Sequence, residues 1–373
     1  MDGGPGWWRR PLLMAAVASL VAAVWSGLAR LPVPVPLPGR VVAWIPLHGP
    51  LMVCAFLGTV ISLERAVGLP WRWTYLAPLL CVMAAAHLIV GGEPASGATL
   101  FTAASGVFVA VTVGILRLRS ELFTALLCAG AVAWLGGNAV WLAGGSFPQV
   151  MPGWVAFLAL TIAGERVDLS RFQKPHPWAR TLLILTLSVL APGVVAASAV
   201  PAWGQRWLGA GLVLLAFWLI RFDLAWRTLR HPGLPRFMSC CLLSGFGWLA
   251  VAGGALVGWA PLTAGFGYDA ALHAFFVGFV VSMILGHAPV IFPSVLGLRL
   301  AWHPVFYTQW ILLQVSLVLR VGADAAGWMA GRQWGGALNA VALLVFLVNT
   351  GVAVWRANRP VVPRTVGQAR RPS

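Results

Sequence analysis

The sequence predicts an all-α, polytopic membrane protein with about twelve transmembrane helices, and three observations support this. Of its 373 residues, 60% are hydrophobic and only 9% are charged, and a soluble domain carries about 25% charged residues. Apolar runs of about twenty residues, the length of a membrane-spanning helix, recur from end to end. Short connections containing Gly and Pro join these runs, and none is long enough to form a soluble domain.

Twelve runs qualify as spans by length. They cover residues 11–30, 41–63, 71–92, 97–117, 120–144, 148–164, 180–200, 205–226, 236–259, 268–292, 304–321 and 334–356. The first run follows the basic flank WWRR, as in a signal peptide, but it is long enough to span and no polar cleavage region follows. We therefore predict one transmembrane domain over residues 1–356 and a basic, disordered cytoplasmic tail over 357–373.

The basic residues predict orientation rather than nucleic-acid binding. The net charge is +16, but arginines sit at the ends of apolar runs, where topology and anionic lipid headgroups favour them. Of the 25 basic residues, 20 lie at the termini or after even-numbered spans, and 5 lie after odd-numbered spans. Both termini are therefore predicted to be cytoplasmic, in a multi-pass protein of a bacterial-type cytoplasmic membrane.

The five cysteines do not predict a disulfide framework. None forms a CxxC pair, and all lie in or beside apolar runs: Cys54, Cys81, Cys128, Cys240 and Cys241. We interpret them as small buried thiols.

Three histidines are predicted to lie at one depth, near the outer face. With the orientation above, His48 and His273 enter the second and tenth spans from outside, and His87 ends the third span there. Neutral imidazole is a good ligand for haem iron, copper and zinc. The pair His48 and His273 suits bis-histidine ligation of a haem. The alternative is that each histidine hydrogen-bonds the backbone of a neighbouring helix.

A second arrangement suits copper. His48 and Met52 are four residues apart, as are Met83 and His87, so each pair shares a helix face. Spans two and three are antiparallel neighbours, and their four side chains offer a soft site for Cu(I). The alternative is that the methionines fill space between helices.

His287 follows His273 by fourteen residues, which places it about 21 Å deeper on the same side of a regular helix. It opens GHAPVIFPSVLG, in which two prolines disturb the helix near the cytoplasmic face. A kink there would free carbonyls for a water or proton path, and His287 is a further candidate metal ligand. The alternative is simple helix termination with His287 at the membrane interface.

An internal echo links two spans. FLGTVISLER (56–65) and FLALTIAGER (157–166) share Phe-Leu, Ile and Glu-Arg at the same spacing. Spans two, six and ten are either related by a four-helix repeat or alike by chance. We expect the Glu-Arg pairs to anchor helix ends by local pairing and snorkelling.

HGPLMVCAFLGTVI in the second span and ALHAFFVGFVVSMILGHAP in the tenth resemble the NnrS family. That resemblance implies a haem- and copper-containing bacterial membrane protein linked to nitric oxide stress. The family's first motif carries a second histidine and a glutamate where this chain has Pro50 and Leu51. More distantly, the layout resembles subunit I of the haem–copper oxidases, whose low-spin haem ligands come from helices two and ten.

The histidine pair predicts a haem protein, with copper as a further candidate cofactor, and the resemblance implies that it transfers electrons or responds to nitric oxide or redox stress. In the haem–copper oxidases that the layout resembles, the copper ligands come from helices six and seven. Spans six and seven of this chain contain no histidine, so a catalytic oxidase with a copper centre is not expected. The redox partner is not identified by the sequence. One alternative is a transporter or copper-handling permease using the His/Met site, and another is a scaffold whose histidines pin helices together.

Overall fold

The helical prediction is confirmed by the computed structural model, which describes residues 9–31, 33, 42–170 and 176–359. In chain order the elements are α1 (Arg10–Arg30), η2 (Ile45–Leu47), α3 (His48–Pro50), η3 (Leu51–Leu57), α4 (Gly58–Val67), η4 (Arg72–Tyr75), α5 (Leu76–Ile89), α6 (Pro94–Leu118), α7 (Leu122–Leu142), α8 (Phe147–Ser170), α9 (Ala179–Ala199), α10 (Pro201–Phe222), α11 (Ala225–Thr228), α12 (Leu234–Trp259), α13 (Gly265–His273), η5 (Ala274–Val281), α14 (Ser282–Leu296), α15 (Phe306–Ala325) and α16 (Met329–Ala357). No β-strand occurs over these ranges. Most of the tail, residues 360–373, lies outside them.

Eleven stretches of helix in the described residues are long and apolar enough to cross a membrane. They correspond to eleven of the twelve predicted spans. The remaining one, predicted over 304–321, forms the 20-residue helix α15. Its run is less apolar than the others because Gln309, Gln314, Arg320 and Asp324 lie in it.

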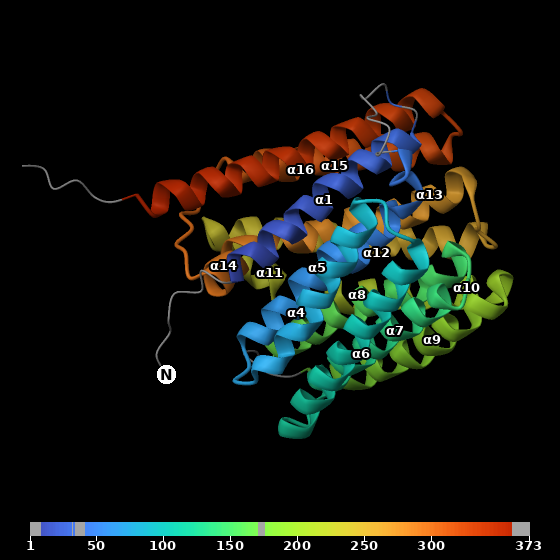
Figure 1. Cartoon of the computed structure of the whole chain (residues 1–373), viewed down its shortest axis with the longest axis horizontal. Helices are drawn as coiled ribbons and strands as arrows, with labels where there is room; N and C mark the ends of the chain where they lie inside the picture. Colours follow the sequence, from blue (N-terminus) through green and yellow to red (C-terminus); the bar gives the residue numbers. More distant parts are fainter. Residues whose placement is uncertain (1–8, 32, 34–41, 171–175, 360–373) are drawn as a thin grey trace, which may run out of the picture.

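Consecutive helices pack side by side around the bundle, and α1 closes the ring against α16. Figure 1 shows α15 and α16 along one edge, with α1 beside them and α6 and α9 on the far side. Small residues allow the closest approaches. A Cβ at Gly209 of α10 would lie 2.5 Å from the carbonyl oxygen of Gly253 in α12, so the two backbones touch in the manner typical of membrane helices.

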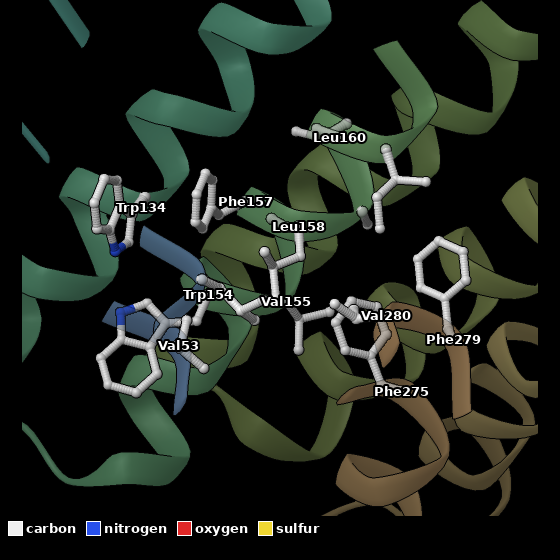
Figure 2. Packing of buried hydrophobic residues seen from close by; sticks show 14 of the residues in the cluster. Val53, Trp134, Trp154, Val155, Phe157, Leu158, Leu160, Phe275, Phe279 and Val280 are labelled. Atoms are coloured by element: carbon white, nitrogen blue, oxygen red, sulfur yellow. The ribbon is translucent and has the colours of Figure 1, made fainter. Parts of the chain in front are cut away.

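The second, sixth and tenth spans form the centre of the bundle. Within their most apolar stretches, 61%, 72% and 67% of the residues are buried, against 28–56% in the other spans. Figure 2 shows the packing between them, with Val53 of η3, Trp154 and Val155 of α8, and Phe275 of η5 converging. These central helices are four spans apart along the chain. The two segments of the sequence echo, in the second and sixth spans, are also four spans apart.

A buried polar node ties the core to its neighbours. The Asn138 amide of α7 donates to the Phe101 carbonyl and the Ser105 hydroxyl of α6, both at 3.1 Å. Its oxygen accepts from Trp154 Nε1 at 2.9 Å and from the Cys54 thiol at 3.3 Å. Every hydrogen-bonding group of this amide has a partner, as burial away from water requires. All five cysteines are free thiols, as predicted, but only Cys54, Cys81 and Cys241 are buried. Cys128 and Cys240 are partly exposed, so the expectation of burial is wrong for these two.

The second and tenth spans are not regular α-helices. Each contains a π-helical segment, η3 after His48 and η5 directly after His273. π-helical turns are rare and occur frequently at functional sites. The wider turns also rotate the rest of each helix, so the regular-helix relation between His273 and His287 does not apply.

Candidate functional site

A cavity of about 440 Å³ opens at the end of the bundle where α13 begins. The first, second, sixth, tenth, eleventh and twelfth spans all contribute to its wall. Both His48 and His273 line it, together with Met52, Met151 and Phe276. The structure therefore brings together the two histidines that the sequence placed at one depth. Its volume is in the range of sites that bind small molecules and cofactors.

The ring of His48 is held by α1. Its Nδ1 lies 2.7 Å from the carbonyl oxygen of Ala23. A carbonyl can only accept, so Nδ1 carries the proton and the lone pair of Nε2 remains available. The ring fits because residue 27 is glycine. A Cβ at Gly27 would lie 2.8 Å from Cε1 and 2.9 Å from Nδ1 of His48.

The ring of His273 is held by its own helix. Its Nδ1 lies 2.8 Å from the carbonyl oxygen of Asp269 and 3.3 Å from the Asp269 carboxylate. The same reasoning assigns the proton to Nδ1 and the free lone pair to Nε2. Neither Nε2 atom has a hydrogen-bond partner among the described residues. Both imidazoles thus have the arrangement usual for a metal-ligating histidine, in which a hydrogen bond fixes the ring nitrogen that faces away from the metal.

One wall of the cavity is cationic. Arg320 and Arg332 pair with the Asp269 carboxylate at 2.6 and 3.2 Å, and Arg30 also lines the cavity. Two further polar groups there, the Tyr268 hydroxyl and the Asn339 Nδ2, are buried with no hydrogen-bond partner in the described part of the chain. Buried polar atoms are normally satisfied. This wall therefore suits an anionic group that also accepts hydrogen bonds.

The residues fit a haem. Two neutral imidazoles have free Nε2 lone pairs, and apolar side chains such as Leu272, Phe276 and Leu343 line the interior. The cationic wall matches the carboxylates that a haem carries. Within the described ranges, no group of three or more His, Cys, Asp or Glu side chains is placed to hold a metal ion by itself.

The four residues of the predicted copper site do not meet in the cavity. Met52 lines it with His48, but Met83 is 48% exposed on the outer surface of α5. His87 packs against Gly92 at the end of the same helix, and its Nε2 is buried without a partner in the described residues. A different methionine, Met151 of α8, lines the cavity instead. Met151 was not predicted, because the sequence echo links α8 to the second span without revealing which face of α8 meets the cavity.

His287 belongs to α14, which Figure 1 shows at the opposite end of the bundle from α13. Its Nδ1 is 2.7 Å from the Met283 carbonyl oxygen, and its Nε2 is 3.3 Å from Nη1 of Arg166. The helix does not end there. It continues past Pro289 and Pro293 to Leu296. His287 therefore belongs to a charged cluster rather than to the cavity.

The expectation of local pairing at the Glu-Arg motifs is wrong, because the pairs form between spans. Arg65 of the second span bonds Glu165 of the sixth. Arg166 forms a two-point ion pair with Asp223 at 2.6 and 2.9 Å, and both side chains are buried. A buried charge needs a partner, and the nearest one lies on another helix. The echoed motifs thus join the helix ends that lie away from the cavity.

The cationic wall was not predicted either, although the sequence carries a signal for it. Arg30, Arg320 and Arg332 are three of the five basic residues found after odd-numbered spans, against the prevailing charge bias. Basic residues that depart from the topology rule need another reason to be there. Here all three line one cavity.

Comparison with known proteins identifies the family of the chain but does not indicate a ligand or a reaction. No curated protein matches the chain. One family model, described as "Domain of unknown function (DUF8744)", matches residues 9–356. This match spans every membrane helix and nearly the whole sequence, and the chain therefore belongs to the DUF8744 family.

Proposed function

We propose that this protein is a membrane haem protein whose cavity holds one haem between His48 and His273. The observation that carries the proposal is that both imidazoles line the same cavity, each with Nδ1 bound to a carbonyl and Nε2 free. Two neutral nitrogen ligands favour a low-spin iron that exchanges electrons. The haem carboxylates would face Arg30, Arg320 and Arg332.

The biological role proposed is electron transfer, or a response to nitric oxide or redox stress, as the resemblance to the NnrS family implies. The bound haem would supply one-electron chemistry. The chain's own residues would hold it, orient its two ligands and balance its charge. The cavity would face the outside of a cytoplasmic membrane, with both termini inside, so a redox partner would meet it there.

The test is a reduced-minus-oxidised visible spectrum of the detergent-purified protein, expressed with ample haem. We expect a low-spin haem signal that His48→Ala and His273→Ala each abolish. His87→Ala and His287→Ala are the matched controls and should keep the signal, because neither residue lines the cavity. A colourless wild type, or a signal retained in both cavity variants, would contradict the proposal.

A second candidate is supported by one observation, the two methionines in the cavity wall. His48, Met52, Met151 and His273 offer two imidazoles and two thioethers, which is a soft donor set suited to Cu(I). The protein would then handle copper, as a permease or a store. Elemental analysis should find copper without a haem spectrum. Met52→Ala and Met151→Ala should lose it, and exposed Met83→Ala should keep it.

A further inference from the structure

The cavity histidines differ in how they are supported. His48 contacts only the backbone carbonyl of Ala23 through Nδ1. His273 Nδ1 also hydrogen-bonds a backbone carbonyl, that of Asp269 one helical turn earlier at 2.8 Å, and it has in addition the Asp269 carboxylate 3.3 Å away as an ion-pair partner. This carboxylate is itself fixed. Arg320 reaches Asp269 Oδ2 at 2.6 and 3.2 Å, through Nη2 and Nε respectively, and Arg332 reaches Oδ1 at 3.2 Å.

Two outer helices each contribute an arginine to this network around Asp269. Arg320 belongs to α15 and Arg332 to α16. The Arg332 Nε also lies 3.3 Å from Oδ1 of Asp324, a buried carboxyl at the end of α15. Gly335 and Gly336 allow Arg320 to lie flat against α16, since a Cβ at either would come within 2.6 Å of it. The hairpin α15–α16 therefore fixes the position of Asp269.

We infer that Asp269 is a positioning residue for His273: it orients the imidazole through Nδ1–H and strengthens its Nε2 as a donor, with Arg320 and Arg332 holding the carboxylate in place. A carboxylate that accepts the distal N–H fixes the tautomer of a ligating histidine and raises its basicity. A stronger donor favours the oxidised form of a bound iron, and so lowers its reduction potential. This inference rests on the proposed function for its redox consequence only.

The experiment compares Asp269→Asn with Asp324→Asn in the haem-loaded protein. Both changes remove one carboxyl group from the same arginine network, but Asp324 makes no hydrogen bond or ion pair with His273 among the described residues. We expect the midpoint potential to rise in Asp269→Asn and to rise much less in Asp324→Asn. Equal rises would show that charge alone acts, and would overturn the inference.

A second readout does not need haem. In protein labelled with ¹⁵N-histidine, the His273 Nδ1–H signal is assigned by its loss in His273→Ala. We expect Asp269→Asn to move this proton upfield, because the negative carboxylate 3.3 Å from Nδ1 is lost while the hydrogen bond to the Asp269 carbonyl remains, and Asp324→Asn to leave it in place. An unmoved signal in Asp269→Asn overturns the inference even if haem binds. A shifted signal in a protein that takes up no haem sustains the inference and refutes only the proposed function.

A further variant covers the case in which Asp269→Asn does not fold. Asp269→Glu keeps the charge and can still reach the arginines, but its longer side chain displaces the carboxylate from Nδ1. The Nδ1–H signal should again move upfield and the potential should rise. No change in either measurement would count against a positioning role.

Discussion

Substituting Gly27 by alanine tests the cavity most directly, because the three atoms nearest to the added Cβ all belong to His48, one of the proposed ligands. The new Cβ would lie 2.8 Å from Cε1 and 2.9 Å from Nδ1 of His48, whereas ordinary contact begins at 3.4 Å. The imidazole must therefore move by 3.4 − 2.8, or 0.6 Å. That movement acts on the 2.7 Å hydrogen bond from Nδ1 to the Ala23 carbonyl.

The effect on stability should be small. Losing one hydrogen bond between membrane helices costs about 0.6 kcal/mol, and the overpacking adds about 1–3 kcal/mol. Replacing glycine by alanine within a helix returns up to about 1 kcal/mol. The net destabilisation of about 1–3 kcal/mol leaves the protein folded. Haem affinity should fall further, by about 10–100-fold, as it does when the partner that orients a ligand is disturbed.

The assay is haem content per protein at limiting haem, measured after purification together with thermal stability in detergent. Gly106→Ala in α6 is the control, because a Cβ there meets nothing within 4 Å. It should retain full haem and gain slightly in stability. If Gly27→Ala also retains full haem, then the contacts of His48 with Gly27 and Ala23 do not position its ring for a ligand, and the proposed role of those contacts is refuted.

Three further predictions concern the rest of the molecule. Asp223→Ala leaves Arg166 buried without its partner, so the protein should lose about 3–5 kcal/mol of stability while its haem spectrum stays unchanged. Asn138→Ala removes four hydrogen bonds of the polar node, which at about 0.6 kcal/mol each should lower stability in a detergent melt by about 2 kcal/mol. In a topology assay, reporters at both termini and in the α6–α7 loop should be cytoplasmic, and one at Gly145 in the α7–α8 loop external; an inverted pattern would reverse the proposed orientation.

The fold class was predictable because lipid imposes one rule on every span. The membrane interior holds no water to hydrogen-bond the backbone, so each span must be an apolar helix of about twenty residues. Such a span can be recognised from its own stretch of sequence. The same rule made α15 the exception. The glutamines and charged residues of α15 make it less apolar than the other spans. The sequence does not explain the charge at Arg320, but the structure does, because Arg320 pairs with Asp269 of the tenth span.

The candidate site was predictable in part. Depth follows from the span boundaries and the arginine bias, so the sequence alone could place His48 and His273 at one level. His87 met the same depth criterion but faces Gly92 rather than the cavity. The depth of a residue follows from its position along one helix. The direction in which its side chain points depends on how the helix is rotated about its axis, and π-helical segments change that rotation in ways that residue spacing does not reveal.

By itself, the sequence determined that the chain is a multi-pass helical membrane protein and which polar side chains interrupt its apolar spans. Only the tertiary structure decided which of those side chains meet. It paired Arg65 with Glu165 and Arg166 with Asp223 across helices, brought Met151 to the cavity in place of Met83, and joined Arg320 and Arg332 to Asp269. The physical reason is that hydropathy and charge bias act along one helix, while ion pairs and cavities depend on which faces of different helices pack together.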